Sequence, residues 1–250
     1  MTQNRWFSCS TRRKSPKLRL FCLPHAGGGT ALYHRWTPFL PQSIELIALK
    51  LPGREDRLDE KPYEELDQLA GELVQPLEPL VAEPYAIFGH SLGAAIGYRL
   101  ALALREASLP APETLIVSAC RSPELWRTAE TLHTLPDAEM IAQLAYRFGP
   151  RQEASENELA LMKIMAKTIR ADLKMLETFR HDDAPPLDCP IFALGGTDDP
   201  QVTRAKLQGW QNMTNRAFGV RFFPGGHFYL RDQPRAVVQT ILSRLAGFLD

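Results

Sequence analysis

The chain contains short apolar runs bounded by proline, glycine and charged residues, which is the pattern of buried strands in a layered protein. The runs that predict strands are Leu18–Leu23, Ile44–Leu49, Ala86–Phe88, Thr114–Ser118, Pro190–Leu194 and Val220–Phe223. Apolar residues at helical spacing predict helices over Tyr63–Val81, the alanine-rich segment that ends at Arg105, Val202–Trp210 and Pro234–Leu249. This alternation predicts an α/β fold with a mostly parallel central sheet flanked by helices on both faces.

The regular alternation stops after the fourth predicted strand, where roughly 70 residues pass without a further strand. Two amphipathic helices are predicted there. The first begins with Asp137 as its N-cap and ends at Gly149, and the second begins at a capping box that starts at Ser155 and continues to Leu176. We therefore expect a helical insertion over about residues 121–186.

Composition favours one domain over residues 18–250, preceded by a flexible polar segment over residues 1–17. Basic and acidic residues are equal in number, 29 each, so no overall positive field points to nucleic acid. The polar N-terminus lacks the apolar core of a secretory signal, and no apolar stretch is long enough for a membrane span. We expect a cytoplasmic protein that binds no membrane.

Four cysteines are scattered along the chain without C-x-x-C spacing, and most adjoin predicted strands, where cysteine is usually a small apolar residue: Cys9, Cys22, Cys120 and Cys189. Structural disulfides and a zinc site are not expected. We predict neither a metal nor an organic cofactor.

The strongest chemical motif is G-x-S-x-G, formed by Gly89, Ser91 and Gly93 between a predicted strand and a predicted helix. In a nucleophile elbow the serine lies on a strained turn, and the glycines allow a close approach of backbone. Ser91 is therefore the predicted nucleophile. The backbone N–H of Leu92, at the start of the helix, is a predicted donor to an oxyanion.

A second glycine-rich loop, residues 25–29, follows the first predicted strand. In enzymes with a nucleophile elbow, the second oxyanion donor lies on a loop after an early strand. We predict that the N–H of Ala26, or less favourably of Gly27, joins that of Leu92 in an oxyanion hole.

A serine nucleophile needs a histidine base and a carboxylate that orients it. His227 and Asp199 follow the last two predicted strands, and the order Ser91, Asp199, His227 is that of the α/β-hydrolases. Asp198 is the alternative acid, but Pro200 fixes the turn directly after Asp199, which favours Asp199.

The remaining histidines are not expected to be the base, because they belong to the oxyanion loop, point away at the elbow or lie in predicted helical regions: His25, His34, His90, His133 and His181.

Taken together, the motifs resemble those of type II thioesterases, the stand-alone editing hydrolases of polyketide and nonribosomal peptide synthesis, over residues 18–248. The matching segments are Leu23–Gly28, Leu51–Arg54, Gly89–Gly93, Ile169–Asp172, Gly195–Pro200 and Gly225–Phe228. The resemblance implies an α/β-hydrolase fold whose helical insertion is a lid. It also implies a Ser91, Asp199 and His227 triad that hydrolyses short or aberrant acyl thioesters on the phosphopantetheine arm of carrier proteins.

Two details of the resemblance have structural consequences. Leu92 stands where many relatives have Met, which we expect to reshape only the pocket wall, because the oxyanion donor is backbone. Arg170 and Asp172 match a motif of the lid, for which the simplest interpretation is a local ion pair.

The alternatives are a general carboxylesterase or acyltransferase of the same fold, since these share the acyl-enzyme, and a catalytically silent binding subunit. The intact Ser, Asp and His set argues against the silent subunit. We expect a monomer whose partners are carrier protein domains.

Overall fold

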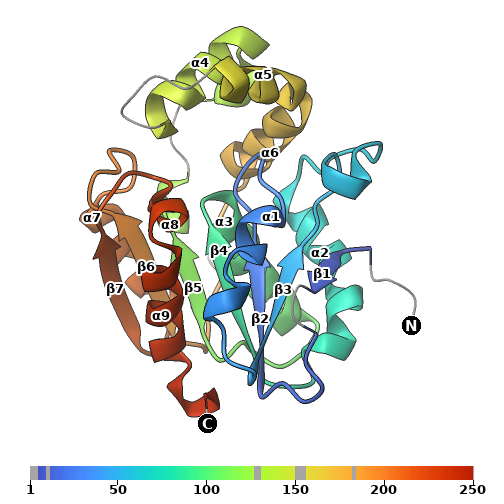
Figure 1. Ribbon diagram of the computed structural model, residues 1–250, viewed down its shortest axis with the longest axis vertical. Coiled ribbons are helices and arrows are strands. Elements are labelled where there is room, and N and C mark those ends of the chain that lie inside the picture. Colours follow the sequence, from blue (N-terminus) through green and yellow to red (C-terminus); the bar gives the residue numbers. More distant parts are fainter. Residues whose placement is uncertain (1–4, 10–11, 127–130, 150–155, 182–183, 250) are drawn as a thin grey trace.

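The computed structural model describes residues 5–9, 12–126, 131–149, 156–181 and 184–249. Its strands form one sheet in the order β1-β3-β2-β4-β5-β6-β7, in which β1 is antiparallel to β3 and every other pair is parallel (Figure 1). The strands are β1 (Phe7–Cys9), β2 (Leu18–Leu23), β3 (Ile44–Leu49), β4 (Tyr85–His90), β5 (Leu115–Ser118), β6 (Ile191–Gly196) and β7 (Phe218–Phe223). The predicted α/β-hydrolase architecture is confirmed.

Helices cover both faces of the sheet (Figure 1). The α-helices are α1 (Ala31–His34), α2 (Leu66–Leu77), α3 (Leu92–Glu106), α4 (Asp137–Phe148), α5 (Glu156–Ile164), α6 (Ala166–Thr178), α7 (Arg204–Gln208), α8 (Tyr229–Asp232) and α9 (Pro234–Arg244). Short 3-10 helices are η1 (Thr37–Phe39), η2 (Glu55–Arg57), η3 (Glu78–Leu80), η4 (Pro123–Leu125), η5 (Leu132–Thr134), η6 (Gly209–Met213) and η7 (Ala246–Phe248). No helix in the described part of the chain is long and apolar enough to span a membrane.

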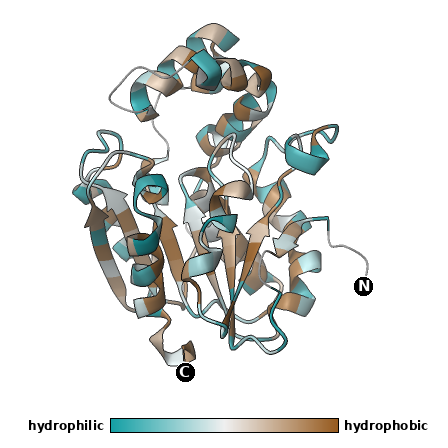
Figure 2. Cartoon of the chain, in the orientation of Figure 1, coloured by the Kyte–Doolittle hydropathy of each residue, from teal (hydrophilic) through white to brown (hydrophobic). Residues whose placement is uncertain are grey.

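Alternate residues of the strands supply two separate cores, one on each face of the sheet. In β2, Phe21 and Leu23 pack into the core that α2 and α3 cover, whereas Leu20 and Cys22 pack into the core that α1 and α9 cover. Figure 2 shows the apolar strands enclosed between helices whose outer surfaces are largely hydrophilic. Strands β4, β5 and β6 are buried on both faces, so they are largely apolar at consecutive positions rather than alternating with polar residues.

The N-terminal segment differs from the expectation of a flexible tail, because residues 7–9 form β1. The preceding Trp6 is only 5% exposed and packs in the core with α2, and Arg57 lies over its ring at 4.4 Å. The backbone N–H of Lys50 also donates to the Trp6 carbonyl. One buried aromatic side chain therefore fixes a segment that is otherwise polar, and local sequence pattern carries no signal for it.

Helices α4, α5 and α6 form an insertion between β5 and β6, at the top of Figure 1. The single second helix predicted from Ser155 is instead α5 and α6, with a break at Met165, and Ser155 itself lies outside the described residues. The break allows α5 to pack against α4 while α6 continues to α3. Asp137 is the first residue of α4 rather than its N-cap, which is Pro136.

Candidate active site

Ser91 lies on the turn between β4 and α3 with a φ of 54°, a left-handed conformation that is unusual for a residue other than glycine. Its backbone N–H donates to the Ser118 carbonyl at the end of β5, over 2.7 Å. A β-carbon at Gly89 would lie 2.1 Å from the Gly93 carbonyl oxygen, and one at Gly93 would lie 2.1 Å from that of Leu23. Both glycines of the motif are thus required by close backbone contacts.

His227 and Asp199 come together after β7 and β6. His227 Nδ1 lies 2.7 Å from Asp199 Oδ2, and Oδ1 of the same carboxylate accepts the backbone N–H groups of Gln201 and Val202. Burial raises the pKa of Asp199, but the hydrogen bonds from His227 and the two amides outweigh it, so the net pKa lies below its ordinary value. Asp198 is exposed, and its carboxylate is 3.4 Å from the Thr197 hydroxyl.

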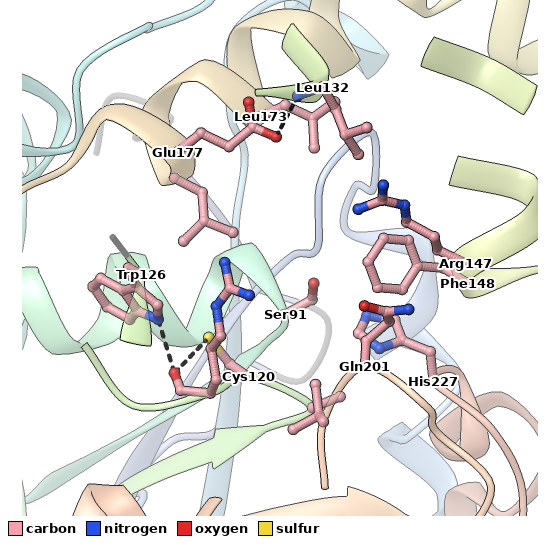
Figure 3. Close-up of a pocket in the computed structure, with 14 residues that line it drawn as sticks. Ser91, Cys120, Trp126, Leu132, Arg147, Phe148, Leu173, Glu177, Gln201 and His227 are labelled. Atoms are coloured by element: carbon pink, nitrogen blue, oxygen red, sulfur yellow. Dashed lines mark hydrogen bonds between the residues drawn. The ribbon is translucent and has the colours of Figure 1, made fainter. Parts of the chain in front are cut away.

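Ser91 and His227 line the same cavity of about 120 Å³. Figure 3 shows both side chains at the cavity, with Cys120 and Trp126 on one side and Phe148 on the other. The insertion supplies much of the wall, through Leu132, Arg147, Phe148, Leu173, Leu176 and Glu177. The Phe148 ring packs against the His227 imidazole with a centroid distance of 4.6 Å, so the insertion shields the histidine from solvent.

The oxyanion loop is a four-residue turn, His25 to Gly28, closed by a hydrogen bond from the Gly28 N–H to the His25 carbonyl. Gly27 has a φ of 69°, as the third residue of a type II turn requires. Its N–H donates to the Asp172 carboxylate, so of the two predicted oxyanion donors Gly27 is already engaged and Ala26 remains the candidate. The contact of Gly93 with Leu23 brings this loop beside the start of α3, where Leu92 lies.

The prediction of a local ion pair between Arg170 and Asp172 is wrong. Asp172 points to the sheet and forms a buried bidentate pair with Arg54, at 2.7 Å for each N–O contact. Arg170 donates instead to the carbonyl of His133 and the carboxylate of Asp137. Residues two apart on a helix face different directions, so each finds its partner on a different element. Arg54 and Asp172 belong to two separate motifs 118 residues apart, so sequence pattern alone does not connect them.

His90 and His25 lie beneath the site. His90 Nδ1 is hydrogen-bonded to the Ser118 hydroxyl, and its ring centroid is 5.2 Å from that of His227, so it is buried below the proposed base. Burial, with a smaller contribution from nearby cationic groups, lowers the pKa of His90 well below its ordinary value and that of His25 to about 3. Both rings are thus uncharged scaffolding in neutral solution. No sequence pattern marks this histidine cluster, because its members become neighbours only after folding.

Among the described residues, no group of three or more His, Cys, Asp or Glu side chains could hold a metal ion. The chemistry that the arrangement supports is nucleophilic. A serine on a strained turn and a carboxylate-bound histidine line one small cavity.

Comparison with known proteins agrees with this geometry. The family model described as "Thioesterase domain" matches residues 18–245. The gramicidin S biosynthesis protein GrsT of Aneurinibacillus migulanus is 34% identical over 242 residues, which are 97% of this chain and 94% of that protein. The human medium-chain S-acyl fatty acid synthase thioesterase is 30% identical over 236 residues, covering 90% of this chain and 86% of that protein.

Among solved structures, the type II thioesterase BorB from the borrelidin biosynthetic cluster is similar with a TM-score of 0.87 and 37% identity. The match covers 96% of this chain and 97% of that one. RedJ, from the prodiginine pathway of Streptomyces coelicolor, is similar with a TM-score of 0.86 and 32% identity, over 92% of this chain and 86% of that one. The chain therefore belongs to the thioesterase family and is a hydrolase of thioesters.

Proposed function

We propose that this protein is an editing thioesterase of nonribosomal peptide or polyketide synthesis, which removes short or aberrant acyl groups from the phosphopantetheine arm of carrier proteins. Ser91 is the nucleophile, His227 the general base and Asp199 the carboxylate that orients it. The observation that carries the proposal is that Ser91 and the Asp199-bound His227 line one cavity. The biosynthetic pathways named for GrsT, BorB and RedJ support the choice of carrier-bound substrates.

In the first half-reaction the Ser91 Oγ attacks the thioester carbonyl carbon, and its proton passes to Nε2 of His227. The new tetrahedral oxyanion is held by the N–H groups of Leu92 and Ala26. The C–S bond then breaks, and the pantetheine sulfur leaves with the proton from His227. In the second half-reaction water attacks the ester carbonyl and its proton passes to Nε2 of His227. The C–O bond to Ser91 then breaks, the proton returns from His227 to Ser91 Oγ, and the free acid is released.

Asp199 supports these proton transfers through the His227 Nδ1 contact. The carboxylate fixes the tautomer that leaves Nε2 unprotonated toward Ser91, and it stabilises the imidazolium that forms. The two backbone donors on its other oxygen hold the Asp199 side chain in one orientation. Because the pair is buried, His227 keeps this orientation without competition from water.

The insertion acts as the lid of the site. Leu173 and Leu176 of α6 line the cavity, whereas Met162 and Met165 pack into a small cluster within the insertion itself. The apolar residues of the insertion therefore supply both the wall of the cavity and the packing within the insertion, and Leu173 belongs to both. A cavity of about 120 Å³ suits a short acyl group. The arm of a carrier protein enters when the lid opens.

Single-turnover hydrolysis tests this function. Acetyl-, propionyl- and longer acyl-carrier proteins are compared with p-nitrophenyl oxygen esters, for the wild type and Ser91→Ala. We expect faster hydrolysis of short carrier-bound thioesters and a loss of at least about 10⁴-fold in Ser91→Ala. A preference for free oxygen esters would indicate a general carboxylesterase, and acyl transfer to an added alcohol or amine would indicate an acyltransferase. Hydrolysis that persists in Ser91→Ala would exclude the proposed nucleophile.

A further inference from the structure

A buried ion pair reaches the oxyanion loop from two distant parts of the chain. Arg54 follows β3 and Asp172 lies on α6, and their side chains are 3% and 1% exposed. Besides the bidentate pair, Asp172 Oδ2 accepts the Gly27 N–H over 2.8 Å, and Arg54 Nη1 donates to the Gly28 carbonyl over 3.1 Å. The two charged groups therefore hold the loop from both sides, at one N–H and one C=O.

The position of these contacts determines the geometry of the turn. Gly27 N–H belongs to the central peptide of the turn, and this peptide points in opposite directions in type I and type II turns. The carboxylate of Asp172 holds the central peptide in the type II direction, in agreement with the φ of 69° at Gly27. The Ala26 N–H belongs to the peptide before the central one, and the two peptides meet at the Ala26 α-carbon. A flip of the central peptide therefore changes the backbone conformation at Ala26 and disturbs the proposed oxyanion donor.

The same face of α6 makes a second contact with the loop. A β-carbon at Gly27 would lie 2.8 Å from Cγ1 of Ile169, one helical turn before Asp172. The next residues along the helix, Leu173 and Leu176, line the cavity. The position of α6 over the acyl site and the geometry of the oxyanion loop are thus linked through one helix face.

We propose that Arg54 and Asp172 are positioning residues, which hold the His25–Gly28 turn so that the Ala26 N–H faces the oxyanion and which make this geometry depend on the docking of α6. The inference rests on the proposed function of Ser91 and the oxyanion hole. Arg54 also neutralises the Asp172 carboxylate, which by itself would repel a developing oxyanion. The pair acts through the loop and contacts no reacting atom.

Three variants separate positioning from simple stabilisation. Arg54→Met/Asp172→Leu replaces the ion pair by apolar side chains, a change that buried pairs often tolerate, but it removes both contacts to the loop. Asp172→Asn keeps an oxygen that accepts the Gly27 N–H. The matched control is Lys174→Met/Glu64→Leu, which removes another ion pair between α6 and the rest of the protein, away from the loop.

The readouts are kcat and KM for an acyl-carrier thioester and the rate at which a fluorophosphonate labels Ser91, because its phosphoryl oxygen occupies the same oxyanion hole. For Arg54→Met/Asp172→Leu we expect kcat and labelling to fall about 30- to 100-fold with KM within about threefold of wild type. Asp172→Asn should stay within about fivefold, and the control within about twofold. Thermal unfolding confirms that each variant is folded.

A folded double variant that labels Ser91 within about threefold of the wild-type rate would overturn the proposal. A labelling rate that falls as far in the control or in Asp172→Asn as in the double variant would also overturn it. If the double variant does not fold, Arg54→Lys decides, because lysine keeps the charge but cannot contact both Asp172 oxygens and the Gly28 carbonyl. We expect labelling about tenfold slower, and an unchanged rate contradicts the inference. A wild type that labels but hydrolyses no thioester refutes the proposed function alone, and the labelling comparison still tests the pair.

Discussion

The His227 imidazole and the Asp199 carboxylate are hydrogen-bonded over 2.7 Å in a buried setting, while the neighbouring Asp198 side chain is exposed. Thr197 and Asp198 lie in a turn that directs Asp198 to solvent, and only Asp199 faces the histidine. The Asp199 oxygen that does not contact His227 accepts hydrogen bonds from two backbone N–H groups, which also fix the orientation of the Asp199 side chain.

This pair predicts a sharp difference between two otherwise similar substitutions. Asp199→Asn should lower kcat by about 10³- to 10⁴-fold, because the amide favours the wrong tautomer of His227. Asp198→Asn should change kcat by less than about twofold, as expected for an exposed side chain outside the site. Steady-state hydrolysis of one acyl-carrier thioester measures both, and equal losses would contradict the assignment of Asp199.

The close packing of the nucleophile turn predicts a stability effect. Gly93→Ala places a methyl group 2.1 Å from the Leu23 carbonyl oxygen, which is backbone and cannot move aside cheaply. We expect a loss of about 3 kcal/mol or more in the free energy of unfolding. Gly71→Ala is the matched control, because a β-carbon at this exposed position of α2 meets nothing within 4 Å. It should stabilise the protein by about 0.5–1 kcal/mol. Chemical denaturation measures both, and similar effects would refute the prediction.

The buried histidines predict a dependence of stability on pH. Burial, helped by neighbouring cations, lowers the pKa of His25 to about 3, and burial lowers that of His90 well below its ordinary value. Both stay neutral in the folded protein, whereas in the unfolded chain they bind protons below about pH 6.5. The unfolded state therefore takes up more protons as the pH falls, and folding stability decreases. The lowered pKa of Asp199 has its effect at a lower pH, below its ordinary value of 3.8.

We expect each of these histidines to contribute a loss of about 2 kcal/mol between about pH 7 and pH 5. His25→Gln keeps an acceptor for Arg231 and removes the titrating imidazole. The loss of folding stability between pH 7 and pH 5 should therefore be about 2 kcal/mol smaller in this variant. Urea unfolding at the two pH values measures it. A variant whose stability falls as steeply as that of the wild type would show that His25 is not the group responsible.

The wall of the cavity predicts which acyl groups are accepted. Leu176→Ala enlarges the cavity at α6, so the optimum chain length should increase by about two carbons, since each buried methylene contributes about 0.8 kcal/mol. Leu144→Ala truncates a half-buried leucine that packs inside the insertion, and it should leave the optimum unchanged. The ratio kcat/KM across a series of acyl-carrier thioesters tests this. The same optimum in Leu176→Ala and wild type would exclude α6 from the acyl wall.

The sequence determined the features that depend on neighbours along the chain. The apolar runs predicted β2 to β7, most clearly for the inner strands, because a strand buried on both faces must be apolar at consecutive positions. The spacing of Gly89, Ser91 and Gly93 identified the strained turn, because only glycine fits where backbone approaches backbone.

The tertiary structure decided everything that depends on partners distant in sequence. It joined Asp172 to Arg54 instead of Arg170, selected Asp199 over Asp198 as the partner of His227, and formed β1 through the burial of Trp6. Local patterns carry little information about these choices, because side chains distant in sequence meet only where the packing of helices on the sheet places them. The sequence thus predicted the inner elements of the fold and the proposed catalytic residues, and packing determined how those residues are oriented.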